Sequence, residues 1–357
     1  MITISLCMIV KNEEQVLERC LRSCGNLFDE IVIVDTGSTD TTKQIASKFT
    51  SNIYDFEWVD DFSRARNFAF SMATGEYLMW LDADDVLMPE DLSKLRTLKK
   101  VLSHNVDAVM MKYRIGLDQK GRASMTYYRE RLVKRASGFR WLDPVHEYIP
   151  VTGNISSVDI AVTHQKEKTE DPNRNLRIYQ RMIANEEPFS SRNTFYYARE
   201  LADHGMAAEA AEQYEKFLGS SDGWVEDYIS ACYELSYCYE KLNNSHNMIS
   251  ALVESFRFSK PRAEICCRIG DYHRSRESYH EAAFWYELAL SLEKPSGWGF
   301  VQEDYWGYIP AMQLCVCYYN LGDLKASERC NTLAKSYKPD DPGVISNEKF
   351  FLGARKK

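Results

Sequence analysis

Apolar and polar residues alternate in blocks along the first half of the chain, in a pattern that predicts strands and helices in turn. Between the strands, apolar residues recur at helical spacing, as they do from Val16 to Cys24. Short apolar runs typical of strands occupy Thr3–Val10, Glu30–Val34, Ser51–Phe56 and Tyr77–Leu81. Strands that alternate with helices over short links are typical of parallel β–α–β units.

Three later strands are expected at Ala108–Tyr113, Tyr127–Arg135 and Ile155–Val162. A helix is expected over Pro89–Val101. Because no long helices separate the later strands, we expect that part of the sheet to be antiparallel. The first half of the chain therefore predicts an α/β domain with a mixed, Rossmann-like sheet.

The second half of the chain is helical, and its helices come in pairs. Equivalent positions at Ala210, Ile249, Ala282 and Ala326 are spaced by about 39, 33 and 44 residues, around a period of about 34. The pattern A-x-x-x-Y-x-x-A-L is clearest from Ala282 to Leu290. These pairs resemble degenerate tetratricopeptide repeats, which bury their faces by stacking and leave a concave surface.

A charged stretch, Gln165–Pro172, separates the two halves and predicts a linker. We therefore expect two domains, residues 1–168 and residues 169–357. An insertion into the repeats at Glu293–Asp304 contains Trp298, a candidate for stacking on a sugar or a peptide. The repeats could stabilise the first domain, bind a polypeptide acceptor or mediate homodimerisation.

Composition and charge narrow the functions open to the chain. Its 357 residues carry a formal net charge of −8, which argues against a general nucleic-acid binder. No segment is apolar enough over sufficient length to span a bilayer. Met1–Val10 lacks a basic start and a cleavage site, so we interpret it as a strand rather than a signal peptide. Ten cysteines without a C-x-x-C pair indicate reduced core thiols in a cytoplasmic protein.

The most informative stretch is Tyr77–Leu87, where a short apolar run ends in three carboxylates. Ligands of open α/β sheets bind beyond the carboxyl ends of the strands, and clustered carboxylates repel one another unless a cation lies among them. If the chain stays extended, Asp82 and Asp84 point to the same side and could both reach one Mg²⁺ or Mn²⁺. The alternative is a polar loop in which Asp85 caps the helix at Pro89–Val101.

Polar residues also follow the other predicted parallel strands. Lys11, Asn12 and Glu13 follow the first strand, and Asp35 ends the second. An aspartate there can accept a hydrogen bond from a base or a ribose, and Arg66 can add a charge-assisted contact. Each residue alone also fits a turn, a cap or a solvated charge, but their order favours a nucleotide site. The phosphate-loop and dinucleotide fingerprints are absent.

Several segments together carry a resemblance to a known family. They read I-S-L-C-M-I-V-K-N-E-E, I-V-I-V-D-T-G-S-T-D, D-F-S-R-A-R-N-F-A, A-T-G-E-Y-L-M-W-L-D-A-D-D and P-V-H-E. In this order they resemble the family-two glycosyltransferases of GT-A fold, over about residues 1–164. The added helical repeats resemble bacterial peptide glycosyltransferases of the sublancin S-glycosyltransferase type. The resemblance implies a nucleotide-sugar donor, a UDP-sugar above all, a divalent cation (Mn²⁺ or Mg²⁺) and inverting transfer.

The resemblance also implies roles for individual residues. Donor-nucleotide contacts fall on the ends of the first two strands and on the helix after the third, at Val10, Lys11, Glu13, Asp35 and Arg66. The Asp-x-Asp element falls on Asp82, Ala83 and Asp84, with Asp84 as the principal metal ligand and Asp82 and Ala83 also near the donor. A late histidine binds the metal in many GT-A enzymes, and this role falls on His164.

Inverting transfer needs a base near the acceptor. The stretch R-W-L-D-P-V-H-E-Y-I offers Asp143 and Glu147, of which we favour Glu147. His146 could orient the base or contact phosphate. His146 and His164 each fit a structural histidine equally well. Asp82 could contact ribose or water rather than the metal.

These observations predict a cytoplasmic, metal-dependent, inverting glycosyltransferase. The repeats favour a peptide or protein side chain as the acceptor, and a growing surface glycan is the alternative. A further alternative, of a different class, is a repeat scaffold whose first domain has lost catalysis and only binds partners.

Overall fold

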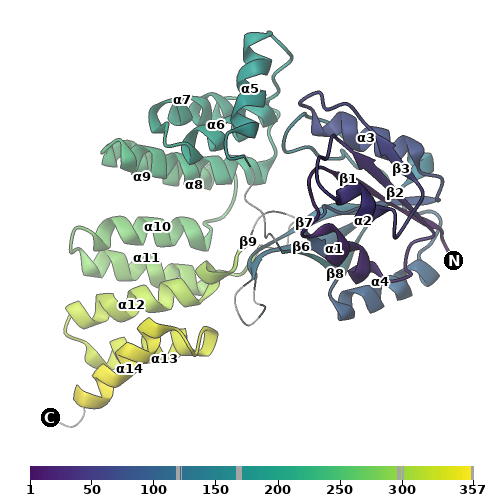
Figure 1. Ribbon diagram of the computed structural model, residues 1–357. Coiled ribbons are helices and arrows are strands. Elements are labelled where there is room, and N and C mark those ends of the chain that lie inside the picture. Colours follow the sequence, from purple (N-terminus) through teal and green to yellow (C-terminus); the bar gives the residue numbers. More distant parts are fainter. Residues whose placement is uncertain (118–120, 122, 166–170, 296–298, 300, 355–357) are drawn as a thin grey trace. The chain divides into compact units, whose positions relative to one another are not determined.

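The computed structural model describes residues 1–117, 121, 123–165, 171–295, 299 and 301–354. The chain divides into two compact units, Met1–Pro188, here the α/β unit, and Phe189–Lys357, here the repeat unit (Figure 1). The boundary that we expected between residues 168 and 169, and the stacking candidate Trp298, lie outside the described residues.

The α/β unit follows the predicted alternation of strands and helices. Its strands are β1 (Ile4–Val10), β2 (Glu30–Asp35), β3 (Ile53–Asp55), β4 (Tyr77–Trp80), β5 (Asp85–Val86), β6 (Ala108–Leu117), β7 (Ala123–Lys134) and β8 (Ile155–His164). Its helices are α1 (Leu17–Cys24), α2 (Thr42–Ala46), α3 (Phe62–Met72), α4 (Pro89–Val101) and α5 (Arg174–Ala184). The mixed α/β architecture expected from the sequence is thus confirmed.

The strands of the α/β unit lie in the order β3-β2-β1-β4-β7-β6-β8-β5. The first four are parallel, and β7 is antiparallel to both β4 and β6. The expectation that the later strands are all antiparallel is wrong, because β8 runs parallel to β6. The chain runs along β6, returns along β7, and then crosses to the other side of β6 to form β8. Because β8 reverses the direction of β7, it runs in the same direction as β6.

The acidic stretch follows a strand that is buried on both faces. Tyr77 and Met79 of β4 enter the core beneath α1 and α4, whereas Leu78 and Trp80 enter the core beneath α3. This is the alternation of period two that a strand imposes on its side chains. Burial of each such side chain contributes about 1.5–3 kcal/mol. Packing from both sides therefore holds the end of β4 in a defined position.

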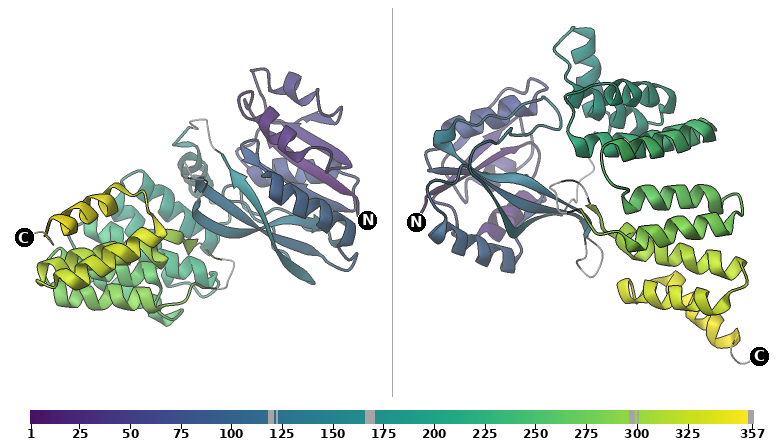
Figure 2. Two further views of the ribbon diagram at one scale, coloured as in Figure 1. Left: turned by 90° about the horizontal axis from the view of Figure 1, so that it is seen from below. Right: turned by 180° about the vertical axis from the view of Figure 1, so that it is seen from behind.

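The repeat unit consists of helix pairs stacked in chain order (Figures 1 and 2). The pairs are α6 (Ser191–Asp203) with α7 (Ala207–Leu218), α8 (Val225–Lys241) with α9 (Ser245–Glu254), α10 (Ala263–Arg274) with α11 (Tyr279–Ser291), and α12 (Tyr308–Asn320) with α13 (Leu324–Tyr337), followed by α14 (Pro342–Ala354). Ile249 on α9 is only partly buried, whereas the equivalent positions Ala210, Ala282 and Ala326 are buried on the second helix of their pairs. Their small side chains let the paired helices pack closely, which explains the repeat pattern.

Among the described residues, no helix combines the length and the apolar character needed to cross a membrane. Nine of the ten cysteines are buried, and Cys330 is partly buried. Burial raises the pKa of several of these thiols, as for Cys232, which reaches about 12. The cysteines therefore act as small core residues.

Candidate functional site

The acidic residues after β4 lie in a tight turn rather than in an extended chain. The Asp85 amide donates a hydrogen bond of 3.0 Å to the Asp82 carbonyl. Asp85 then begins β5, and antiparallel pairing with β8 places it opposite His164. The Gln165 amide adds a hydrogen bond of 2.9 Å to the Asp84 carbonyl. Because of this turn, the side chains of Asp82 and Asp84 contact different residues, Arg66 and His164 respectively.

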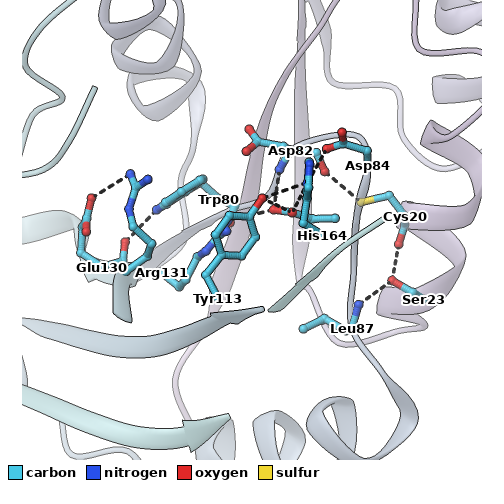
Figure 3. A network of polar contacts seen from close by, with 12 residues as sticks. Cys20, Ser23, Trp80, Asp82, Asp84, Leu87, Tyr113, Glu130, Arg131 and His164 are labelled. Carbon is cyan, nitrogen blue, oxygen red and sulfur yellow. Dashed lines mark hydrogen bonds and ion pairs between the residues drawn. The ribbon is translucent and has the colours of Figure 1, made fainter. Parts of the chain in front are cut away.

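Asp84, Asp85 and His164 form a compact group of ligand atoms. Figure 3 shows Asp84 and His164 side by side. His164 Nδ1 lies 3.3 Å from Asp84 Oδ1 and 3.7 Å from Asp85 Oδ1. One donor atom from each residue lies within 4.8 Å of the other two. Hydrogen bonds to Asp84 and Asp85 raise the pKa of His164 to about 10, against the opposing effect of burial. A protonated imidazole therefore balances the two carboxylates when no cation is bound.

Asp85 is fully buried, and both of its carboxylate oxygens accept hydrogen bonds. Oδ1 accepts from the Tyr113 hydroxyl at 2.8 Å. Oδ2 accepts from Arg131 Nη1 at 3.0 Å and from the Asp82 amide at 3.1 Å. The Tyr113 hydroxyl also lies 3.1 Å from His164 Nδ1. Asp85 therefore holds the backbone of the turn directly and the ring of His164 through Tyr113.

Arg131 supplies the buried positive charge behind this turn. Its guanidinium lies 3.7 Å from the centre of the Trp80 ring and 4.4 Å from that of Tyr113. Arg131 Nη1 also donates to the Trp80 carbonyl at 3.2 Å. The Trp80 indole N–H donates to the Glu130 carbonyl at 2.7 Å, which fixes the ring (Figure 3). Two aromatic faces and one ion pair thus offset the cost of burying a guanidinium.

Arg66 joins Asp82 to Glu147. Its Nη2 lies 2.7 Å from Asp82 Oδ1, and its Nε lies 2.6 Å from Glu147 Oε1. The guanidinium packs against the rings of Trp80 and Trp141, with centroids 5.0 Å and 4.8 Å away. Burial alone would raise the pKa of Asp82, but Arg66 and neighbouring arginines hold it at about 2. In this arrangement Arg66 is engaged by two carboxylates of the protein itself.

The loop with the two candidate bases is anchored to α3. The side-chain amide of Asn67 bonds to both the carbonyl and the amide of Trp141, at 2.9 Å each. Asp143 and His146 adopt positive φ angles of 67° and 53°. Such conformations cost on the order of 1–3 kcal/mol and cluster at functional loops. Of the two candidate bases, Glu147 is the one that the arginine bridge ties to the acidic turn.

Asp35 ends β2 and is 1 % exposed. Its Oδ1 accepts hydrogen bonds from the amides of Gly37 and Ser38, at 2.9 Å and 2.8 Å. Gly37 has a φ of 100°, which glycine adopts readily. Among the described residues, the buried Oδ2 has no hydrogen-bond partner. Because a buried carboxylate oxygen without a donor is costly, an N–H or hydroxyl of a ligand would satisfy it.

The other expected nucleotide contacts gather beside Asp35. Parallel register pairs Val10 with Asp35. Lys11 is exposed, and the Glu13 amide donates to Thr42 Oγ1 at 2.7 Å, in the helix after the turn. The structure therefore brings these residues together at one edge of the sheet.

The structure also places Ala83 and Asp85. The Ala83 side chain packs in the core, which leaves only its backbone for a ligand. The capping alternative for Asp85 is wrong, because α4 follows Met88 and has no side-chain cap.

Sequence reasoning also missed Tyr113 and Arg131. The signal for Arg131 was a charge placed directly before the apolar residues Leu132 and Val133 of a strand, where burial would require a partner.

Comparison with known families identifies the chain. Residues 5–203, more than half of its 357 residues, match the model of glycosyl transferase family 2. The chain therefore belongs to glycosyl transferase family 2. Residues 263–295, which span α10 and α11, match the tetratricopeptide repeat. Both resemblances seen in the sequence are confirmed.

Two curated relatives illustrate the similarity. The chain is 27% identical over 266 residues to the SPbeta prophage-derived glycosyltransferase SunS of Bacillus subtilis, over 70% of this chain and 57% of the relative. It is 35% identical over 150 residues to a TPR repeat-containing protein of Synechococcus elongatus, over 42% of this chain and 36% of the relative. The chain thus spans between about a third and somewhat more than half of the length of these relatives.

Solved structures show a more distant likeness. S. aureus TarS 1-349 in complex with UDP-GlcNAc is 14% identical, with a TM-score of 0.38, over 94% of this chain and 92% of that one. The MamA protein is 16% identical, with a TM-score of 0.37, over 46% of this chain and 82% of that one. Likeness at this level carries no argument about substrate.

Proposed function

We propose that this chain transfers a sugar from a UDP-sugar to a polypeptide side chain, with inversion and with a divalent cation. The observation that carries the proposal is the pair of Asp84 Oδ1 and His164 Nδ1, 3.3 Å apart, at the end of a central strand. Membership in glycosyl transferase family 2 supports a nucleotide-sugar donor.

The ligand atoms at the acidic turn fit a divalent cation. Asp84 and His164 would hold it, because both oxygens of Asp85 already accept hydrogen bonds from the protein. Carboxylates suit Mg²⁺ or Mn²⁺, and the imidazole favours Mn²⁺ because Mg²⁺ takes oxygen ligands. A bound cation would offset the negative charge of the departing diphosphate. The contribution of the chain is to hold Asp84 and His164 in place beforehand.

Asp35 and the end of β1 suit the nucleotide. The buried Oδ2 of Asp35 would accept a hydrogen bond from a base N–H or a ribose hydroxyl. Val10, Lys11 and Glu13 would contact the same nucleotide from the neighbouring strand end. Asp82 would contact ribose or water, because Arg66 already occupies one of its oxygens.

Glu147 is the favoured base, and Asp143 is the alternative. In a single displacement, the acceptor oxygen or sulfur bonds to the anomeric carbon while the bond to the diphosphate oxygen breaks, and the base takes the acceptor proton. This inverts the anomeric configuration. The bridge through Arg66 to Asp82 supports Glu147, because it ties the carboxylate to the acidic turn.

A polypeptide acceptor is supported by the repeat unit and by the resemblance to bacterial peptide glycosyltransferases. Stacked helix pairs present an extended surface that suits an extended chain. Mass spectrometry of co-expressed candidate substrates tests this part: a sugar-mass increment on a peptide is expected. Sugar incorporation only into glycan would replace the polypeptide by the glycan alternative. Nuclear magnetic resonance of the product would then report its anomeric configuration.

Hydrolysis of a panel of UDP-sugars with Mn²⁺ tests the donor and metal site. Asp84→Asn should lower the rate by about 100-fold or more, because charge stabilisation by a metal is worth several kcal/mol. The matched control is Asp91→Asn on α4, which alters a buried carboxylate that accepts a hydrogen bond from the Ala161 amide and is not part of the group Asp84, Asp85 and His164. An Asp84→Asn variant as active as wild type would refute the metal role.

A further inference from the structure

The repeat unit contains a polar cavity of about 490 Å³ that the proposed transfer does not use. It is lined by the ends of α8 and α10, the start of α9, the turn after α10, and one residue of α12. Ligand sites typically have volumes of about 300–1,000 Å³, so this one is large enough for a side chain and the adjoining backbone of a ligand.

Three arginines line this cavity, Arg268, Arg274 and Arg276. They differ in how far carboxylates of the protein balance their positive charges. Arg268 is paired with Glu240, at 2.7 Å and 3.3 Å, and lies 3.7 Å from the centre of the Tyr237 ring. Arg276 lies 4.0 Å from the centre of the Tyr272 ring. Stacking on tyrosines holds both groups in place, so little side-chain freedom remains to be lost on binding.

Within the part of the chain that the structure describes, no carboxylate forms an ion pair with Arg276. Its guanidinium donates to the neutral Ser245 hydroxyl at 3.2 Å and makes no ion pair with any described residue. Arg274 is hydrogen-bonded to Tyr286 and lies 3.8 Å from Asp271, but its buried Nε has no hydrogen-bond partner among the described residues. Asp271 in turn accepts a hydrogen bond of 2.7 Å from Tyr286. An incoming carboxylate would satisfy donors that the protein leaves unused.

The neutral residues of the cavity distinguish between kinds of anion. Asn243 and Gln313 line it with side-chain amides that form no hydrogen bonds within the described residues. An amide both donates and accepts, as does the backbone of an extended peptide, whereas a free phosphate offers mainly acceptors. This combination of amides and guanidinium groups fits an acidic side chain carried on a peptide backbone.

We propose that this cavity binds an acidic segment of a polypeptide, with its carboxylate placed between Arg274 and Arg276. As a docking site for the acceptor, it rests on the proposed function. The site binds a part of the acceptor other than the residue to be modified, and so contributes to the choice of substrate.

Binding of an acetylated Glu-Ser octapeptide to the full chain, without donor or metal, tests the proposal. Isothermal titration should show binding by wild type that is at least about tenfold tighter than binding by Arg276→Gln, the change expected for one charged hydrogen bond. The matched control Arg257→Gln alters an exposed arginine paired with Glu254 outside the cavity, and should bind as wild type does. A Gln-Ser octapeptide should bind more weakly than the Glu-Ser peptide.

Three results would overturn the proposal. They are equal binding of the two peptides, equal binding by wild type and Arg276→Gln, and tighter binding of inorganic phosphate than of the acidic peptide. The last would make the cavity a general anion site. Because neither donor nor metal is present, failure here leaves the transfer reaction untouched. Conversely, an active Asp84→Asn variant would refute the metal role without affecting peptide binding.

Discussion

Each unit places an aspartate beside an arginine, but the pKa of one carboxyl group is lowered and the pKa of the other is raised. Asp82, in the α/β unit, lies 2.7 Å from Arg66, and despite partial burial this and neighbouring arginines hold its pKa at about 2. Asp227, on α8 of the repeat unit, is 2 % exposed, and its ion-pair partner Arg192 is 3.4 Å away. Burial outweighs that contact and raises the pKa of Asp227 to about 6.

The difference shows that close, well-aligned donors rather than mere proximity keep a carboxyl group charged in the interior. The acidic turn of the α/β unit keeps its negative charge through arginines on neighbouring strands and helices, and this suits it to a cation. In the cavity of the repeat unit, the buried Nε of Arg274 has no hydrogen-bond partner among the described residues. On the proposals made above, the acidic turn suits a metal cation and the cavity suits an acidic peptide, which are ligands of opposite charge.

Removal of the buried arginine should have the largest effect. Arg131→Met leaves Asp85 buried without its ion-pair partner, at a cost of about 3–5 kcal/mol in the stability of the α/β unit. Hydrogen exchange of β4 and β7 in urea would measure it. The control Arg22→Met breaks an exposed pair with Glu18 and should cost less than about 1 kcal/mol.

Two results would decide the role of this pair. The double variant Arg131→Met/Asp85→Asn should recover part of the lost stability, because no unpaired charge then remains buried. Equal costs for Arg131→Met and Arg22→Met would show that the buried pair does not support the acidic turn.

Removal of the Tyr113 hydroxyl should have the next largest effect. Tyr113→Phe keeps the ring against Arg131 but loses the bonds to Asp85 and His164. Loss of such a supporting contact typically weakens metal binding by about 10–100-fold, and we expect the lower figure. Mn²⁺ titration followed by electron paramagnetic resonance would measure the change without turnover.

Tyr77→Phe is the matched control for this variant. It removes a buried hydroxyl that bonds to the Val106 carbonyl at 2.7 Å, in the core and away from the acidic turn. Its Mn²⁺ affinity should equal that of wild type. If the two variants bound Mn²⁺ equally well, Tyr113 would have no positioning role.

Strand ends were predictable from the sequence, whereas contacts across the sheet were not. Asp35 and the residues after β1 come together because the strands are parallel, a property that the short β–α–β links already indicate. The meeting of Asp85 with His164 depends on the register of β5 against β8, which joins distant parts of the chain. The separation of Asp82 from Asp84 depends on one hydrogen bond that closes a turn. Periodicity carries no information about either.

The repeat unit shows the same division. Its helix pairs follow from an apolar pattern at Ala210, Ala282 and Ala326, because a repeat must bury the same face each time. The cavity at Arg274 and Arg276 has no counterpart in that pattern. These two arginines lie at the end of α10 and in the turn after it, outside the buried positions that the repeat pattern marks.

The affinity for Mn²⁺ should increase with pH. The pKa of His164 is about 10 without the ion, so the imidazole is protonated from about pH 6 to about pH 9 and must lose its proton to bind a metal. The affinity should therefore rise by up to about tenfold per pH unit. Titration calorimetry in buffers of different ionisation enthalpy would count the released proton. His164→Gln should bind Mn²⁺ more weakly and with a shallower pH dependence, and an unchanged slope would remove His164 from the site.

The remaining effect, expected from Asp227→Asn, is of interest for its sign, which tests the contrast between the two carboxyl groups. The folded pKa of about 6 exceeds the unfolded value of about 3.9, so the neutral carboxyl stabilises the fold fully below about pH 4. This contribution is lost as the pH rises through about 6. Asparagine stays neutral, so Asp227→Asn should stabilise the repeat unit by roughly 1–2 kcal/mol at about pH 8 and change little at about pH 4.

Hydrogen exchange of α8, corrected for the intrinsic pH dependence of amide exchange, would measure this difference in the full chain. Stabilisation at high pH alone would mean that burial dominates at Asp227 because Arg192 is too distant to hold the charge. Destabilisation at high pH would mean that Arg192 acts on Asp227 as Arg66 acts on Asp82. An arginine would then keep a carboxyl group charged in both units, at 3.4 Å as well as at 2.7 Å. The short distance between Arg66 and Asp82 would not explain the negative charge of the acidic turn.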